Sequence, residues 1–132
     1  MSELIFLTLD EVFSIHARSL IEHGGSAGVR DSGLIESALA SARNTVCYAS
    51  GDLFDVAASY AFHVSESQAF VDGNKRTGVA AAMVFLARNG VYVQPPPWEL
   101  YVAMIDVAEK KKTKADLAEI FRKSAGFETR NT

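Results

Sequence analysis

The stretch QAFVDGNKRTG, residues 68–78, joins a short apolar turn to an acid, a glycine and two adjacent cations. Directly behind it the chain enters a long alanine-rich apolar segment. This segment predicts a helix over 73–89, because Asn89 and Gly90 are typical C-terminal caps and the residues before them are apolar on nearly all sides. A helix that is apolar all round is normally buried, so we expect this one to be the central helix of the fold.

The rest of the chain repeats apolar residues at helical spacing. Three helix starts carry capping signals, namely Thr8 with Glu11, Asp31 or Ser32, and Thr113 with Asp116. The expected helices cover 8–22, a segment that begins after Asp31, 53–66, 98–110 and 114–125. Residues 44–52 lack a clean period and are expected to form a loop or a short flap. Residues 91–97 are proline-bound and are expected to be a brief extended piece.

Length, composition and charge describe one ordinary globular domain. The chain has 132 residues, of which 48% are hydrophobic and 22% charged, and its formal net charge is -3. We therefore expect a single all-α domain over 1–132, with about six helices around a buried central helix and a frayed tail at 127–132. A single cysteine cannot form an internal disulfide, and the N-terminal residues resemble neither a signal peptide nor a membrane span. The expected location is the cytoplasm, and the net charge argues against a general nucleic-acid binder.

The opening stretch has the order of groups that a magnesium-nucleotide site needs. The first turn of a helix favours an anion through its unpaired N–H groups and its positive dipole end. Gly73 would permit close backbone approach, while Lys75 and Arg76 add two cations at the same helix end. Asp72 would repel a phosphate but suits Mg²⁺, which proteins usually bind through one or two carboxylates plus phosphate oxygens. The alternative is that Asp72 is an N-cap and that both cations are solvated surface charges.

The stretch FVDGNKRT, residues 70–77, closely resembles the core motif of the Fic/Doc superfamily, in particular its Doc (death-on-curing) toxin branch. The pattern of that branch is His-x-Phe-x-Asp/Asn-x-Asn-Lys-Arg-Thr. The segments FLTLDEV, residues 6–12, and GGSAGVRDSGLIESAL, residues 24–39, also resemble it, so the resemblance extends over most of 6–90. It implies a compact helical fold that transfers a phosphate-containing group from a nucleotide to a hydroxyl of a target protein. The Doc branch further implies phosphorylation of a translation factor, elongation factor Tu, and restraint by a small antitoxin.

The resemblance also implies roles for the matching residues of this chain. Phe70 would fix the loop in the core, and Asp72 would bind Mg²⁺. The nucleotide, ATP, would be held by the residues that follow: Gly73 and Asn74 as an anion nest, Lys75 and Arg76 on the phosphates, and Thr77 as a cap or a further phosphate contact.

The first position of the motif departs from the pattern, because Gln68 stands where the family has histidine. The resemblance implies that this histidine is the general base that takes the proton from the attacking hydroxyl. Glutamine can accept a hydrogen bond but cannot hold a proton, and general-base catalysis typically contributes about 10²- to 10⁴-fold. Transfer is therefore expected to be weak, whereas nucleotide binding need not suffer. Either a degenerate family member or a one-base inactivating change in an active toxin would produce Gln68.

Other titratable residues are poor replacements for the missing base. His63 would lie about 140° from Gln68 on a continued helix, so we expect a surface or half-buried polar role for it. His16 and His23 are expected on the polar face and at the C-terminal end of the first helix. Glu66 is closer to the motif, but a surface charge at a helix end is the expected role.

Three functions follow from these observations. The first is a Doc-type toxin that is a base-deficient, nucleotide-dependent phosphotransferase and regains activity on Gln68→His. The second is a catalytically silent binding module that keeps the fold and can keep the antitoxin contact. The third is an adenylyl-transferring (AMPylating) relative. Lys75 argues against the third, because adenylylating Fic proteins generally have a second glycine at that position.

The resemblance implies a Phd-like antitoxin as partner, with a C-terminal segment that folds as a helix into a groove. The candidate anchors for such a helix are Trp98, Leu100, Tyr101 and Met104. Core packing of the helix over 98–110 is the expected role of these side chains instead. The basic run KKKTK, residues 110–114, is expected to be a solvated connection. Neither a membrane nor a nucleic acid is expected as a direct partner.

Overall fold

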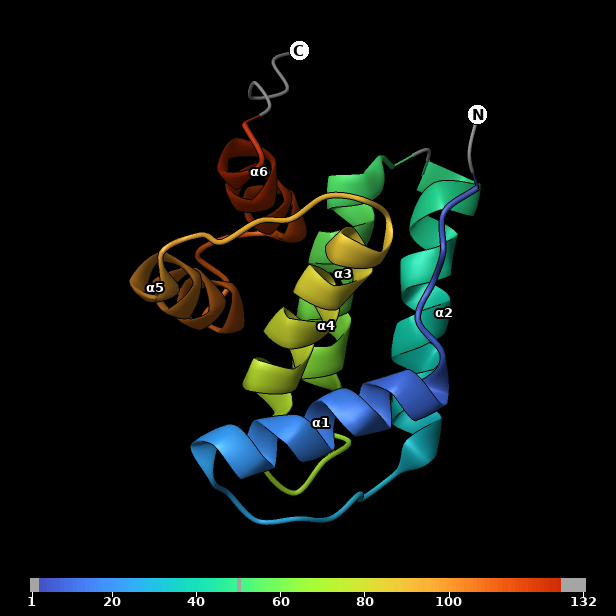
Figure 1. Ribbon diagram of the computed structural model, residues 1–132, viewed down its shortest axis with the longest axis vertical. Helices are drawn as coiled ribbons and strands as arrows, with labels where there is room; N and C mark the ends of the chain where they lie inside the picture. The colour runs from blue at the N-terminus through green and yellow to red at the C-terminus, as the bar shows by residue number, and fades with distance from the viewer. Residues whose placement is uncertain (1–2, 50, 127–132) are drawn as a thin grey trace.

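The computed structural model describes residues 3–49 and 51–126, and these residues form a compact bundle of helices (Figure 1). The helices are α1 Leu9–His23, α2 Ser32–Ala49, α3 Leu53–Ser67, α4 Asn74–Arg88, α5 Pro97–Ala108 and α6 Lys114–Ser124. The described part of the chain contains no β-strand, only an isolated bridge between Val29 and Phe70. The expected all-α fold of about six helices is confirmed, while the expected frayed tail at 127–132 lies outside the described residues.

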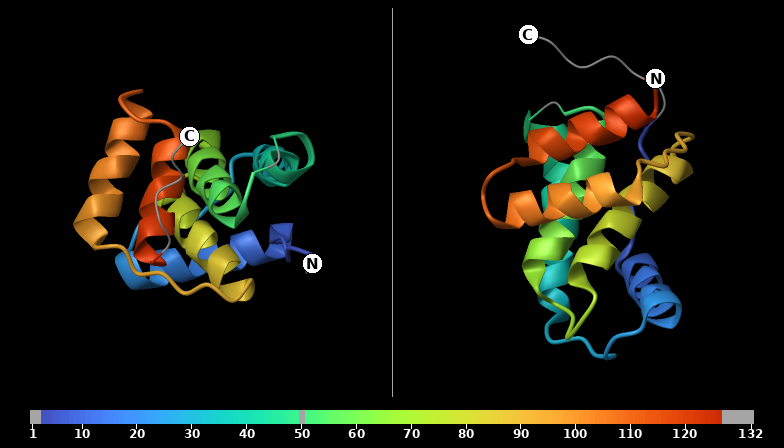
Figure 2. Two further views of the ribbon diagram at one scale, coloured as in Figure 1. Left: turned by 90° about the horizontal axis from the view of Figure 1, so that it is seen from above. Right: turned by 90° about the vertical axis from the view of Figure 1, so that its left-hand side faces the viewer.

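The central helix is α3, not the helix that follows the motif. α3 packs against α2, α4 and α6, as the views in Figures 1 and 2 show. Its buried residues are Phe54, Val56, Ala57, Ala58, Ser59, Tyr60, Ala61, Val64 and Ser65. α4 packs mainly against α3 and α1. The prediction of a central α4 is wrong because part of its apolar surface, including half-buried Val79 and Met83, lines an open groove instead of the core.

Capping groups fix the helix starts that the sequence predicts. In the box that opens α1, Thr8 Oγ1 accepts from the Glu11 N–H at 3.2 Å and Glu11 Oε1 accepts from the Thr8 N–H at 2.9 Å. Thr113 and Asp116 form the same box at α6. Asp31 Oδ1 accepts from the Gly33 N–H at 2.9 Å in the first turn of α2. Each bond satisfies a backbone donor that has no partner within its helix.

The expected loop over 44–52 is wrong in its first half, because α2 continues to Ala49. Thr45 Oγ1 lies 3.2 Å from the Ser41 carbonyl oxygen and 3.1 Å from Ser59 Oγ on α3. Val46 packs against the core. The contacts of Thr45 with Ser59 and of Val46 with the core are tertiary, and they hold β-branched residues in a helix that their propensity alone does not favour.

A buried arginine joins α6 to the start of α3. Arg122 Nη2 lies 2.9 and 3.1 Å from the two carboxylate oxygens of Asp52, the N-cap of α3, and Nη1 bonds to Glu119. Burial raises the pKa of Asp52, but hydrogen bonds from the Asp55 N–H and from Arg122 outweigh it and lower this pKa.

Over residues 3–49 and 51–126, no helix has the length and apolar character needed to cross a membrane.

Candidate functional site

The loop between α3 and α4 carries the motif and is fastened to the segment between α1 and α2. The Val71 N–H donates to the Gly28 carbonyl at 3.0 Å, and the Arg30 N–H donates to the Ala69 carbonyl at 2.6 Å. These bonds flank the bridge between Val29 and Phe70. The glycine-rich segment GGSAG, residues 24–28, therefore lies beside the motif (Figure 1).

Phe70 anchors the loop in the core, in agreement with its expected role. Its side chain is fully buried, and its ring stacks on His16 with centroids 3.8 Å apart and planes 8° apart. Phe13 meets the same ring edge-on at 6.1 Å. Asn74 Oδ1 accepts from the Phe70 N–H at 3.1 Å, and Asn74 Nδ2 donates to the Phe70 carbonyl at 3.0 Å. The side chain of Asn74 thus shapes the loop, and only its backbone N–H is left for the expected anion nest.

Asp72 is exposed and held at its backbone and at both carboxylate oxygens. Oδ1 accepts from the Gly73 N–H at 2.9 Å, and Oδ2 accepts from the Ser26 N–H at 3.2 Å. The Asp72 carbonyl oxygen lies 2.8 Å from His16 Nε2. A Cβ at Gly25 would lie 2.9 Å from Asp72 Oδ2, so glycine is needed there for this close approach.

A small pocket of about 330 Å³ opens over the loop. Its lining contains six of the predicted site residues together with Val71: Gln68, Asp72, Gly73, Asn74, Lys75 and Arg76. Thr77 is the exception, because its side chain is fully buried and its Oγ1 has no hydrogen-bond partner within the described residues. A phosphate contact through the Thr77 hydroxyl has no support from this geometry.

The N-terminus of α4 gives the pocket a positive character. The helix begins after Gly73, whose φ of 81° lies in the left-handed region, and no side chain among the described residues caps it. Lys75 and Arg76 are exposed, and neither forms an ion pair with any carboxylate in the part of the chain that the structure covers. Arg76 Nη2 donates to the Gly24 carbonyl at 3.0 Å. Unpaired first-turn N–H groups and two unneutralised cations suit an anion such as phosphate.

The acidic part of the site suits a metal ion that arrives with phosphate. Asp72 offers one exposed carboxylate at the pocket, and nowhere in residues 3–49 and 51–126 do three His, Cys, Asp or Glu side chains gather in a metal-binding group. Mg²⁺ commonly uses only one or two protein carboxylates and completes its shell with phosphate oxygens and water. The residues therefore fit a Mg²⁺ ion bound jointly by Asp72 and by phosphate oxygens, rather than a metal held by protein ligands alone.

Gln68 lies at the edge of this pocket, as the C-cap of α3. Its φ of 52° and ψ of 29° are left-handed, and its side-chain Nε2 donates to the Ser65 carbonyl at 3.2 Å. Histidine is among the residues that adopt this conformation more often than most. The backbone at this position is thus compatible with the histidine of the family pattern.

None of the three histidines lines the small pocket, and neither does Glu66. His63 Nε2 lies 3.0 Å from Lys114 Nζ on α6, which agrees with the expected polar role. Burial and the charge of Lys114 lower the pKa of His63 to about 4, so its ring is neutral at neutral pH. His23 is exposed and lies 3.9 Å from the Glu22 carboxylate, and Glu66 is exposed at the end of α3.

His16 is the histidine that contacts the motif loop, and the prediction of a polar face for it is wrong. Its side chain is only 5% exposed and lies against Phe70 and Asp72. The sequence does indicate that His16 is buried, because it follows Val12 by four residues and precedes Ser19 by three, which places all three on one helix face. All three are buried on one face of α1.

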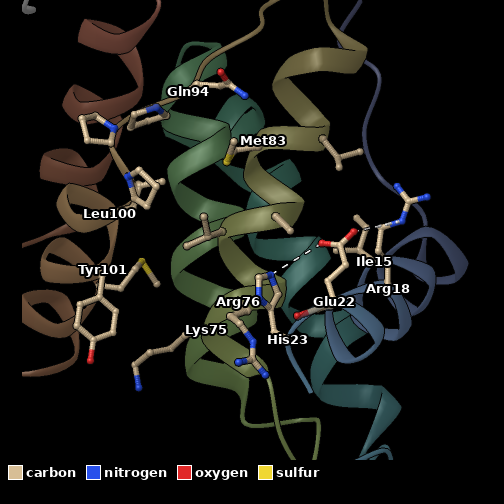
Figure 3. A pocket seen from close by; sticks show the side chains of 18 of the residues that line it. Ile15, Arg18, Glu22, His23, Lys75, Arg76, Met83, Gln94, Leu100 and Tyr101 are labelled. Carbon is tan, nitrogen blue, oxygen red and sulfur yellow. Dashed lines mark ion pairs between the residues drawn. The ribbon is translucent and has the colours of Figure 1, made fainter. Parts of the chain in front are cut away.

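A second, larger cavity of about 1190 Å³ forms a groove between α1, α4 and α5 (Figure 3). Leu100 and Met104 line it while packing in the core, as expected for α5, and Tyr101 stands exposed at its rim. Trp98 is exposed and does not line the groove, so the expected core packing is wrong for Trp98 and Tyr101. Lys75 and Arg76 line both cavities, so the pocket and the groove share a wall at the start of α4.

The fold and the site define the class of this protein: the chain belongs to the Fic/DOC family, whose family model matches residues 6–86. It is 31% identical over 118 residues to Protein kinase doc of Escherichia phage P1, an overlap that covers 89% of this chain and 93% of the phage protein. It is 45% identical over 73 residues to Toxin Doc of Mycolicibacterium smegmatis, which covers 54% of this chain and 56% of that toxin. The resemblance read from the motif is confirmed.

Proposed function

We propose that this chain is a Doc-type toxin of a toxin–antitoxin module. Its site is built for transfer of the γ-phosphoryl group of ATP to a hydroxyl of a target protein, and Gln68 impairs that transfer. The proposed target is a translation factor such as elongation factor Tu, which would place the protein in the cytoplasm. The phage relative is a protein kinase by name, which supports phosphoryl transfer as the reaction.

One observation carries the proposal: a single pocket is lined by the carboxylate of Asp72, the uncapped start of α4 and the exposed cations Lys75 and Arg76. A solvated surface would not need the glycine at position 25 that lets the chain approach Asp72, or the loop held in shape by Asn74. The pocket thus has the fixed loop geometry that binding a phosphate chain requires.

The residues divide the work of phosphoryl transfer between them. The N–H groups of the first turn of α4, together with Lys75 and Arg76, would bind and orient the phosphates and offset the charge that develops on them. Asp72 would hold Mg²⁺, which when bound would neutralise phosphate charge. The hydroxyl oxygen of the target attacks the γ-phosphorus, the bond to the bridging oxygen breaks, and ADP leaves.

Gln68 affects only the removal of the proton from that hydroxyl. Its amide cannot take up the proton, so the proton must pass to solvent or to phosphate oxygen, and the step loses the gain from general-base catalysis of about 10²- to 10⁴-fold. None of the phosphate-binding groups is removed by glutamine. Binding without efficient transfer is the expected behaviour of the chain.

The proposed partner is a Phd-like antitoxin that inserts an amphipathic helix into the groove between α1, α4 and α5. The groove has apolar walls that include Val79. Ile15 and Met83 belong to the same walls (Figure 3). Lys75 and Arg76 give the groove a basic end, which favours a helix that carries acidic residues there, whereas Arg18 on the opposite wall pairs with Glu22. Such a helix would lie against the same two cations as the phosphates.

Gln68 also supports a second candidate, a silent binding module that uses the groove and has no transferase activity. Adenylyl transfer is less well supported, because Lys75 occupies the position where adenylylating relatives generally have glycine.

Calorimetric titration with Mg-ATP tests the proposed site directly. The chain should bind Mg-ATP, and Arg76→Ala should weaken binding about 10- to 100-fold, which corresponds to the loss of a charge-assisted hydrogen bond. Arg18→Ala is the matched control, because Arg18 lies outside the small pocket and pairs with Glu22 at 4.0 Å. Absence of binding by the parent chain, or equal binding by the Arg76→Ala variant, would contradict the proposal.

A further inference from the structure

We infer that His16 is a positioning residue of the phosphate-binding loop: its Nε2–H holds the Asp72 carbonyl and thereby fixes the orientation of Asp72 and Gly73 at the start of α4. The consequence for nucleotide binding rests on the proposed function. The contact itself does not, because it is a property of the fold.

His16 reaches the loop from a different part of the chain. It projects from α1, is 5% exposed, and places Nε2 2.8 Å from the carbonyl oxygen of Asp72. A Cβ at Gly73 would lie 3.7 Å from His16 Cδ2 and 3.8 Å from Arg76 Nη2. The edge of the imidazole ring, the backbone of Gly73 and the guanidinium of Arg76 therefore meet at the point where a phosphate is proposed to bind.

The partner atom determines which ring nitrogen carries a proton. A carbonyl oxygen only accepts hydrogen bonds, so Nε2 of His16 must be the donor. Because this N–H is used by Asp72 and the ring is buried against Phe70, His16 cannot accept the proton of a substrate hydroxyl through Nε2. His16 is thus close to the site without being a substitute for the base that Gln68 lacks.

The hydrogen bond completes a set of three that hold Asp72. Its carbonyl accepts from His16, Oδ1 accepts from the Gly73 N–H and Oδ2 accepts from the Ser26 N–H. The two carboxylate bonds come from the loop itself and from the neighbouring glycine-rich segment. Among the described residues, the bond from His16 is the one that ties Asp72 to α1. Removing this donor should loosen Asp72 and Gly73, while the bonds of Val71 to Gly28 and of Asn74 to Phe70 still hold the rest of the loop.

Two substitutions separate the hydrogen bond from the bulk of the ring. His16→Phe keeps an aromatic ring that can stack on Phe70 but removes the donor. His16→Gln removes the ring but can place its side-chain Nε2 at about the same reach as the imidazole Nε2. A residue that only fills the core would tolerate phenylalanine better than glutamine, whereas a residue that positions the loop through its N–H would tolerate glutamine better.

Amide hydrogen exchange measured on peptides covering 69–76 tests the inference without any ligand, with α6 as the internal reference. We expect exchange in this loop to be about 3- to 10-fold faster in His16→Phe and near the parent rate in His16→Gln, with α6 unchanged in both. Equal loop exchange in His16→Phe and the parent, or faster exchange in His16→Gln than in His16→Phe, would overturn it. If His16→Phe does not fold, nuclear magnetic resonance of the parent determines which ring nitrogen of His16 carries the proton. A neutral ring protonated only at Nδ1 is incompatible with the hydrogen bond to Asp72 and would overturn the inference.

Calorimetry with Mg-ATP then measures the consequence for the site. We expect His16→Phe to bind about 3- to 10-fold more weakly than the parent and His16→Gln within about twofold of it. If the parent does not bind Mg-ATP, the proposed function fails, and the hydrogen-exchange order alone decides the role of His16. If the parent binds and His16→Phe binds equally well, the inference fails while the proposed function stands.

Discussion

Asn74 bonds to both backbone polar groups of Phe70, with Oδ1 3.1 Å from the amide nitrogen and Nδ2 3.0 Å from the carbonyl oxygen. The pair is buried, so neither backbone group can turn to water if the side chain is lost. A carboxamide supplies a donor and an acceptor at once, which a carboxylate of the same size does not. The motif asparagine is thus explained by the shape of the loop.

Asn74→Asp should lower the free energy of unfolding by about 1–3 kcal/mol, because the Phe70 carbonyl would face an acceptor in place of a donor. Urea denaturation monitored by circular dichroism gives this value. Asn44→Asp is the control, since Asn44 is exposed on α2, and it should change stability by less than about 0.5 kcal/mol. Equal effects of the two substitutions would show that the Asn74 bonds contribute nothing to stability.

Gly78→Ala should destabilise the contact between α3 and α4. Alanine is favoured over glycine in a helix by about 1 kcal/mol, but a Cβ here would lie 2.6 Å from Ser65 Oγ and 2.7 Å from the Ala61 carbonyl oxygen. Overpacking of this kind costs about 1–3 kcal/mol and exceeds the gain in helix propensity, so we expect a net loss of up to about 2 kcal/mol in chemical denaturation.

Ser65→Ala added to Gly78→Ala should recover part of that loss, because it removes the shorter contact. Ser65 Oγ has no hydrogen-bond partner within the described residues, so Ser65→Ala alone should cost little. A Gly78→Ala variant more stable than the parent would mean that the two helices separate easily at this point.

His63 should make stability depend on pH between about 4 and 6.5. Burial and Lys114 lower its pKa from 6.5 to about 4 in the folded chain, so the unfolded chain binds more protons in this interval. The contribution of His63 is fully present above pH 6.5 and is lost as the pH falls toward 4. Denaturation at a series of pH values should show stability rising with pH across this window, and His63→Gln should remove that part of the slope. An unchanged slope in His63→Gln would contradict the lowered pKa.

Met83→Lys should prevent binding of a Phd-type antitoxin helix, because it places a charge in the apolar wall of the groove. A synthetic peptide of the C-terminal segment of a Phd antitoxin, titrated by fluorescence anisotropy, serves as the probe. Trp98→Lys is the control, since Trp98 is 68% exposed and lies outside the groove lining. Tight binding by Met83→Lys would place the antitoxin contact elsewhere on the protein.

The helix starts were predictable because capping side chains are local. Thr8 with Glu11 and Thr113 with Asp116 form the boxes that the sequence predicts. The end of α2 was not predictable, since Thr45 is held in the helix by its contact with Ser59, a residue of α3. Local propensity carries no information about such a contact.

The pocket was largely predictable, because six of its residues come from one continuous motif. The contact between His16 and Asp72 was not predicted, since these residues are 56 positions apart and no local pattern relates them. The family resemblance implied that Thr77 is a cap or a phosphate contact, but the turn of α4 directs its side chain into the core. Neighbours in a helix point in different directions, so adjacency in a motif does not mean adjacency in a site.

A transfer assay that compares three proteins tests whether the site is a phosphotransferase that lacks its general base. The parent chain, Gln68→His, and Gln68→His combined with Asp72→Ala are each incubated with Mg²⁺, a bacterial translation extract and ATP labelled at either the γ- or the α-phosphate. We predict γ-label on a protein only with the single Gln68→His variant, in a band that identifies the target and matches elongation factor Tu. No label from Gln68→His while it still binds Mg-ATP would contradict the phosphotransferase and favour a silent binding module, and transfer of α-label instead would identify an adenylyl transferase.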